Sequence, residues 1–330
     1  MAGSAFFWYQ CFIMQKIMRR KIIFPCVALL AVFPLYAEPD VKSDTSLALT
    51  VSSLPEAKLT LAQSFTLPFL RGEHFLVENN NVKFGLDAEL SPVSMNLKGD
   101  AVITPAAFFQ LAAGGMIGSG WNIELFGGEV RGIGKNVRAA DGSTSADASP
   151  LDGVFAEGHF GGALQFDIAA LFPGDWNHVV FRSYHEIGYK AYSRAAKGEA
   201  WFFENDFGEN QNGWNYYGNY LAGYQMPIFL NTVALLAEMR KYLYGSPGGG
   251  QWGDALGRWE FSAIMNFAVT KSFSAALITQ FRTLRRYSDY SYGDDFDLFY
   301  QDRHLADGSS RRLSFYRVAA VMQYRFGAGD

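Results

Sequence analysis

The sequence has little cysteine, little charge and no motif of a known catalytic centre. Of 330 residues only Cys11 and Cys26 are cysteines, and charged residues make up 18%, against about 25% in globular proteins. Since both cysteines lie near the start, the rest of the chain has no thiol for a disulfide framework, a metal site or a nucleophile. A glycine-rich phosphate loop, an HExxH motif and a GxSxG motif are also absent. We therefore expect no enzyme activity, no metal and no cofactor.

Long hydrophobic runs and an excess of basic residues are missing as well. Beyond residue 37, no segment reaches the roughly 18 continuous apolar residues of a transmembrane helix. With 28 basic and 32 acidic residues and a net charge of −4, the chain is not suited to nucleic acid, and we expect no such partner.

Glycine and aromatic residues are plentiful. The chain contains 34 Gly, 29 Phe, 17 Tyr and 7 Trp, and 49% of its residues are hydrophobic. This composition is typical of a large all-β protein with many turns and girdles of aromatic side chains.

The first 37 residues have the pattern of a secretory leader. Arg19, Arg20 and Lys21 precede an apolar run over 22–33, and Ala37 closes a cleavage site. A membrane anchor is the alternative, but the run is short for a span of about 20 residues. A lipid-modified Cys26 is a second alternative, and this cysteine lies inside the apolar run rather than at its end.

Residues 1–13 or 1–17 precede this leader and fit it poorly, so the natural start is expected at Met14 or Met18. Residues 1–37 contain four basic and no acidic residues, so the mature chain has 24 basic and 32 acidic residues and a charge of −8. Cleavage also removes both cysteines.

The remainder of the chain alternates between apolar and polar residues in runs of about ten, the length of a membrane-spanning β-strand. The clearest runs lie over 82–90, 160–170 and 259–269. We predict an antiparallel, up-and-down transmembrane β-barrel over 58–326, with a short periplasmic segment over 38–57 and a tail over 327–330. About twelve strands are expected, near 58–70, 81–91, 92–103, 106–117, 120–131, 154–171, 178–192, 214–226, 229–243, 258–269, 272–286 and 312–326.

The predicted connections alternate in length. Short turns follow every second strand, for example Pro227–Ile228 and Thr270–Lys271, whereas Gly132–Gly153 is long and rich in Gly, Asp and Ser. Short periplasmic turns and long outer loops are typical of outer-membrane barrels, and an even strand number leaves both termini in the periplasm.

Apolar and aromatic residues alternate down the final strand, from Tyr316 to Phe326. Here the chain resembles the outer-membrane β-barrel superfamily, whose last strand carries an aromatic-rich signal read by the outer-membrane assembly machinery. The resemblance implies that Tyr324 and Phe326 form that signal, that the protein lies in the outer membrane, and that lipid is its environment. The chain departs from the pattern because Gly327–Asp330 follow Phe326. In composition it is also similar to uncharacterised spirochaete outer-membrane barrels.

The alternation assigns Phe84, Leu164, Phe261 and Val318 to the lipid face and many charged residues to the lumen. Two roles are open for these charges: a selectivity field across an open pore, or a ladder of ion pairs that fills the barrel. We expect the arginines of the last strands to be either hydrated or paired with Asp87, Glu89, Glu238 or Glu260. The candidate selectivity residues are Asp87, Glu89, Arg182, Glu186, Glu238, Arg240, Glu260, Arg282, Arg286 and Arg317.

Two functions fit this pattern: a channel or porin for small hydrophilic solutes, and an adhesin that contacts a host or extracellular ligand through its long loops. Trp201–Phe203 and Phe296–Tyr300 would supply exposed aromatics for binding, or would fold inward and narrow the pore. A remote alternative is a hydrolase similar to outer-membrane phospholipases, because Ser183 and His185 share a lipid-facing side. That family has the order His-x-Ser, the reverse of this one. The acidic loop around Asp294 is expected to be solvated rather than to bind Ca²⁺. The sequence does not determine the oligomeric state.

Overall fold

The computed structural model describes residues 41–54, 56–74, 76–125, 128–138, 144–147, 150–204, 206, 208–245, 256–285, 305 and 311–327. Its strands are β1 Lys42–Ser52, β2 Ala57–Pro68, β3 Asn81–Leu90, β4 Ser94–Ala106, β5 Phe109–Gly120, β6 Ile123–Leu125, β7 Gly128–Val130, β8 Ile133–Arg138, β9 Thr144–Asp147, β10 Phe155–Asp167, β11 His178–Tyr192, β12 Trp201–Phe203, β13 Gly213–Gln225, β14 Leu230–Tyr242, β15 Arg258–Ala268, β16 Phe273–Arg285 and β17 Arg311–Phe326. The 3-10 helix η2 Ile168–Ala170 follows β10. Within these residues no helix is long and apolar enough to cross a membrane.

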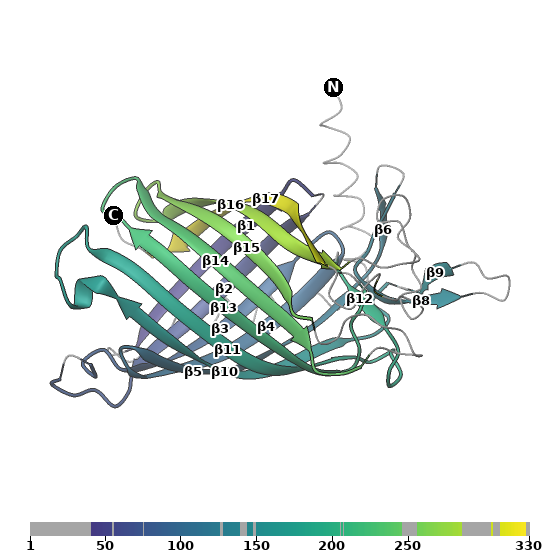
Figure 1. Cartoon of the computed structure of the whole chain (residues 1–330), viewed down its shortest axis with the longest axis horizontal. Helices are drawn as coiled ribbons and strands as arrows, with labels where there is room; N and C mark the ends of the chain where they lie inside the picture. The colour runs from purple at the N-terminus through teal and green to yellow at the C-terminus, as the bar shows by residue number, and fades with distance from the viewer. Residues whose placement is uncertain are drawn as a thin grey trace, which may run out of the picture. The chain divides into compact units, whose positions relative to one another are not determined.

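Twelve of the strands form a closed antiparallel barrel in the order β1, β17, β16, β15, β14, β13, β11, β10, β5, β4, β3, β2 (Figure 1). Each strand pairs with its neighbour along the chain, and β1 closes the barrel by pairing with β17, with Leu47 opposite Tyr324. Closure leaves no unpaired edge, which is what a β-structure needs in hydrocarbon. The predicted fold class and the number of strands are confirmed.

One predicted strand is misplaced. Residues 38–57 were expected to be a periplasmic segment, but the first barrel strand, β1, lies there. Conversely, the predicted strand over 120–131 is not in the barrel, and its residues form the small β6–β7 hairpin. β1 escaped detection because its alternation rests on only Leu47, Leu49 and Val51. The predicted leader over 1–37 and most of the tail lie outside the described residues.

Because the strands are exchanged, some connections lie at the other end of the barrel from the end that was predicted. The connections 69–80, 107–108, 168–177, 226–229 and 269–272 lie at one end, here named the turn end. The connections 53–56, 91–93, 121–154, 193–212 and 243–257 lie at the other, here named the loop end. The turn at Ser91–Pro92 was expected with the short turns and instead joins the long loops. Faces are unaffected, because the direction in which a side chain points depends on alternation within a strand.

The outer surface of the barrel is apolar. The predicted lipid-facing residues Phe84, Leu164 and Phe261 are 48%, 59% and 40% exposed, and Val318 shares the outward face of β17 with Met322 and Tyr324. The intervening positions carry charged and small residues. A soluble protein buries its apolar face, whereas this one presents it outward, so the barrel is a transmembrane one.

A small second core lies at the loop end. β8, β9 and β12 form a three-stranded sheet beyond the barrel strands (Figure 1). Ile133, Phe155, Tyr192 and Trp201 pack together there and are almost completely buried. Trp201 and Phe202 are 0% and 2% exposed, so of the two alternatives for Trp201–Phe203, an exposed binding surface or an inward fold, these two rings do not form an exposed surface. These rings hold the long loops to the rim of the barrel.

Candidate functional site: the lumen and the loop across its mouth

Two neighbouring strands give the lumen a wall of small side chains. The inner positions of β1 and β2 follow from register, since Thr60 and Ala62 lie opposite Glu89 and Asp87, and Thr50 opposite Val321. Apart from Lys58 near the loop end, the inner face of these strands has no side chain larger than threonine from Ser46 to Ser52 and from Thr60 to Thr66: Ser46, Ala48, Thr50, Ser52, Thr60, Ala62, Ser64 and Thr66. This wall contributes little side-chain volume to the lumen.

The opposite wall carries arginines packed on tyrosines. The guanidinium of Arg182 lies 5.0 Å from the ring centre of Tyr184, and that of Arg240 lies 5.4 Å from Tyr217. Such cation–π contacts hold a flexible cation near one position. Within the described residues, neither arginine has a carboxylate within ion-pair distance, so both carry charge into the lumen.

The tyrosines of these two arginine–tyrosine pairs also contact acidic groups. Tyr184 donates a hydrogen bond to Glu186, and Tyr217 donates one to Glu238, both at 2.5 Å. Glu238 lies directly opposite Glu260 on β15. This wall therefore carries both positive and negative side chains and does not form a purely basic surface.

The last strand, β17, contains a β-bulge. Gln280 and Phe281 on β16 lie opposite Arg317 and Phe315, so Tyr316 is an extra residue in β17. The bulge turns Tyr316 into the lumen, where the ring lies 3.9 Å from the guanidinium of Arg282 and 4.8 Å from that of Arg317. The alternation had placed Tyr316 on the lipid face, and this is wrong, because one extra residue in a strand shifts its face.

The arginines of the last strands have acidic neighbours. Arg282 lies directly opposite Glu260 on the adjacent strand. Arg317 forms an ion pair with Glu56 and donates to Gln280, and Gln280 donates to Glu260. Of the two expected states, hydrated or paired, Arg317 is paired, and its partner Glu56 is in a turn that the sequence did not single out.

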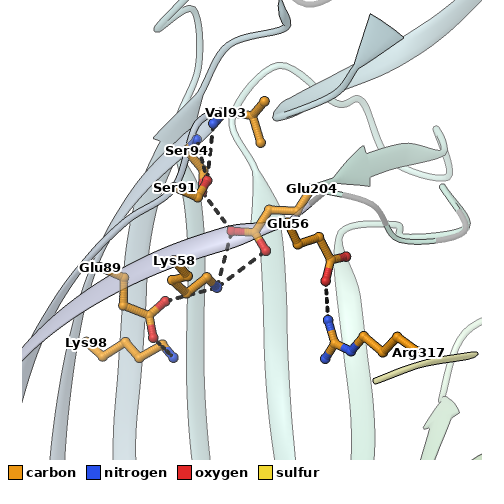
Figure 2. Close-up of polar contacts among 9 residues, drawn as sticks. All are labelled: Glu56, Lys58, Glu89, Ser91, Val93, Ser94, Lys98, Glu204 and Arg317. Atoms are coloured by element: carbon orange, nitrogen blue, oxygen red, sulfur yellow. Dashed lines mark hydrogen bonds and ion pairs between the residues drawn. The ribbon is translucent and has the colours of Figure 1, made fainter. Parts of the chain in front are cut away.

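On β3 and β4 the lumen charges form an ion-pair ladder. Glu89 lies between Lys58 at 3.4 Å and Lys98 at 2.5 Å (Figure 2). Asp87 lies opposite Lys98. This wall therefore matches the structural interpretation of the charges.

The loop over 193–212 crosses the mouth of the barrel at the loop end. It leaves from β11 and returns to β13, yet the carboxylate of Glu204 reaches Lys58 on β2 at 3.4 Å and accepts a 2.7 Å hydrogen bond from Ser94 on β4 (Figure 2). β2 lies across the barrel from β13. Glu204 has φ of 52°, which is uncommon for a residue other than glycine, and its amide donates to Gly132.

The same loop has a second anchor on another wall. Glu209 is completely buried and accepts hydrogen bonds from Arg258 on β15 and Arg285 on β16. Arg285 also donates to the carbonyl of Leu256. A buried carboxylate needs such partners, since an unpaired charge in the interior is costly.

Hydrogen bonds also hold the described parts of the loop around the two anchors. Asn212 donates to the carbonyls of Tyr192 and Ala195, and Trp201 and Asn210 exchange backbone hydrogen bonds. Burial raises the pKa of Asp206, although Asn210 and Gly208 donate to its carboxylate. The loop is thus a fixed constriction, built into the rim from three sides.

The structure brings most of the predicted lumen residues to the inner face. The residues found there by register are Asp87, Glu89, Arg182, Glu186, Glu238, Arg240, Glu260, Arg282 and Arg317. Arg286 lies outside the described residues, as do Phe296–Tyr300 and the acidic loop around Asp294. Sequence analysis missed Arg258, although it has the same parity as Glu260. It also missed Glu204 and Glu209, because a loop has no periodicity to reveal them.

The residues considered for a hydrolase do meet. Ser183 Oγ lies 2.9 Å from His185 Nε2, and His185 Nδ1 lies 2.5 Å from the hydroxyl of Tyr216. β11 is paired on both sides, so its amides are used in the ladder and offer no oxyanion hole. The three polar groups satisfy one another on the lipid face, which is a sufficient structural role.

Among the described residues, no three His, Cys, Asp or Glu side chains are grouped so that they could hold a metal ion. The predicted assembly residues Tyr324 and Phe326 lie at the end of β17, with ring centres 5.1 Å apart. Both face outward and are about half exposed.

Three solved structures are similar to the chain at low sequence identity. The chain is similar to the β domain of the Bordetella autotransporter BrkA, with 11% identity, 86% of this chain and 98% of that chain covered, and a TM-score of 0.38. It is also similar to the NanC porin, with 8% identity, 86% and 98% coverage and a TM-score of 0.38. The KdgM porin matches with 10% identity, 85% and 98% coverage and a TM-score of 0.35. No protein-family model and no curated protein sequence matches the chain.

Proposed function

We propose that the protein is an outer-membrane channel for small hydrophilic solutes, with its long loops at the cell surface. The observation that carries the proposal is the lumen wall of β1 and β2, whose inner side chains are no larger than threonine from Ser46 to Ser52 and from Thr60 to Thr66. A barrel filled by its own side chains needs bulk on all walls, as small eight-stranded barrels have. Here the bulky Arg182, Tyr184 and Tyr217 lie across the barrel from a wall of small side chains.

The loop over 193–212 sets the size limit of this channel. Its two carboxylate anchors lie on different walls, at Lys58 and at Arg258, so the loop narrows the mouth. Because the anchors are charged and buried or half-buried, the loop is expected to stay in place during transport.

The competing adhesin function loses its main support in the described residues. It relied on exposed aromatics in the loops, but Trp201 and Phe202 are buried in the small core.

Conductance of the purified barrel in planar bilayers tests the proposal. A steady, ohmic step on insertion supports a channel. A variant in which a short Gly-Ser linker replaces 199–211 should give larger steps, because the constriction is removed. The absence of steps from correctly folded wild-type and linker barrels would reject the channel.

A further inference from the structure

A polar pocket opens from the lumen at the turn end, away from the constriction. It is a cavity of about 410 Å³, and its polar lining consists of Asn79, Asn81, Lys83, Thr104, Gln110 and Gln165. Register places the strand residues of this set on the inner face, since Asn81 lies opposite Thr104 and Gln110 opposite Ala163. A solute that passes through the barrel meets this pocket.

The pocket is preformed. Asn80, only 2% exposed, donates to the carbonyls of Leu70 and Pro105 at 3.0 and 2.8 Å. The amide of Ala107 donates to Leu76 at 2.8 Å. These bonds join the 69–80 connection to the end of β4, so the flanking Asn79 and Asn81 are held at the rim.

The lining is rich in carboxamides. Asn79, Asn81, Gln110 and Gln165 each carry an acceptor oxygen and an NH₂ donor, and Thr104 adds a hydroxyl. Gln165 donates to the carbonyl of Ala107 at 3.0 Å, which fixes its amide. Side chains that both donate and accept are complementary to hydroxyl groups, which do the same.

Lys83 is the one charged group in this lining. It is exposed, and within the described residues it has no ion-pair partner. Its cross-strand neighbours, Thr66 and Val102, are uncharged. On the adjacent strand β4, Asp100 lies two positions along from Val102, and its carboxylate lies 3.2 Å from His159. On β3 itself, the nearest acid on the same face is Asp87, about 13 Å along the strand. The pocket therefore presents a single cation within a set of hydrogen-bonding amides.

We propose that this pocket binds a sugar acid, that is, a polyhydroxylated solute of monosaccharide size with one carboxylate. Lys83 would bind the carboxylate by a charge-assisted hydrogen bond, and the carboxamides would bind the hydroxyls. The volume falls in the range of small-ligand sites, about 300–1,000 Å³. The proposal rests on the proposed channel function, because the ligand reaches the pocket through the lumen.

Isothermal titration of the purified full-length barrel in detergent tests the proposal, with D-glucuronate, D-glucose and acetate as probes. We expect glucuronate to bind about tenfold more tightly than either of the others, since each lacks one half of the recognition. Lys83→Gln should reduce glucuronate affinity to that of glucose. Lys271→Gln removes an exposed lysine at the same end outside the pocket and should leave the affinity unchanged.

Equal affinity for acetate and glucuronate, or an unchanged affinity in Lys83→Gln, would overturn the proposal. Conductance separates this result from the channel function. Conductance without glucuronate binding rejects the pocket and leaves the channel, whereas binding without conductance rejects the channel and leaves the pocket. Because Lys83 is exposed, its replacement should not prevent folding, which heat-modifiable gel mobility checks.

Discussion

Arg285 donates a 2.9 Å hydrogen bond to Glu209, and the two side chains are 3% and 0% exposed. Arg285 ends β16, whereas Glu209 belongs to the loop between β11 and β13, which are four and three places away from β16 in the barrel order. Arg258 shares the same carboxylate oxygen. The pair therefore joins the constriction to the barrel wall at a buried site.

Glu209→Ala should destabilise the folded barrel strongly, because two guanidiniums lose their common carboxylate. Breaking a buried ion pair by removing one partner costs about 3–5 kcal/mol. Urea unfolding followed by tryptophan fluorescence measures the change. Glu129→Ala is the control, since Glu129 pairs with Arg131 at a partly exposed site and such pairs contribute about 1 kcal/mol or less. An equal loss of unfolding free energy in both variants would show that the Glu209 anchor contributes no more than an exposed ion pair.

Glu204→Ala should loosen the loop and leave the barrel intact. The variant frees Lys58 and Ser94 from the loop, while Lys58 keeps its ion pair with Glu89. We expect faster amide hydrogen exchange at Trp201–Glu204 and unchanged exchange in β11 and β13, measured by mass spectrometry. Asp175→Ala, which changes an exposed residue at the turn end, should leave amide exchange unchanged both in the loop and in the strands. Unaltered exchange in Glu204→Ala would mean that the Glu204 anchor does not hold the loop.

Unpaired and paired lumen arginines should differ in their effect on ion selectivity. Arg182 and Arg240 lie on tyrosine rings with no ion pair in the described residues, whereas Arg317 is paired with Glu56. Arg182→Gln combined with Arg240→Gln should shift the reversal potential in a salt gradient toward cation preference. A double change of Arg317→Gln and Glu56→Gln should leave it nearly unchanged, because the net charge is kept. Equal shifts would show that pairing does not govern selectivity.

The end of β17 should be needed for closure as well as for recognition. Deleting Tyr324–Phe326 removes the ladder partners of Leu47 and Thr45 on β1 and exposes unpaired edges to lipid. Tyr324→Ser with Phe326→Ser keeps the backbone pairing and removes only the aromatic rings. If the rings are the assembly signal, both variants fail to reach the outer membrane, as measured by heat-modifiable mobility in membrane fractions. Normal assembly of the serine variant would leave closure as the only role of this segment.

The barrel could be predicted from sequence because its strands alternate strictly between lipid and lumen. That periodicity predicts the correct face, lipid or lumen, for Phe84, Asp87 and Arg282, although some connections were predicted at the wrong end of the barrel. It failed at β1, where only three apolar residues mark the strand, and at Tyr316, where a bulge reverses the face. A bulge is a local backbone event with no signature in the alternation itself.

The constriction could not be predicted for a different physical reason. Glu204 and Glu209 gain their partners from strands that are distant along the chain, such as β2 and β16. The sequence of Trp201–Phe203 is compatible with two arrangements, an exposed aromatic surface or an inward fold. Only the packing of Trp201 against Phe155 and Tyr192 decides between them.

The open lumen is the central claim, and single-channel recording of the purified wild-type barrel in planar bilayers tests it most directly. The small inner side chains of β1 and β2 and the fixed loop predict steady, ohmic conductance steps. The loop-trimmed variant with a linker in place of 199–211 should give larger steps. Silent membranes from folded protein of both kinds would contradict the account, because they would mean that the side chains fill the lumen.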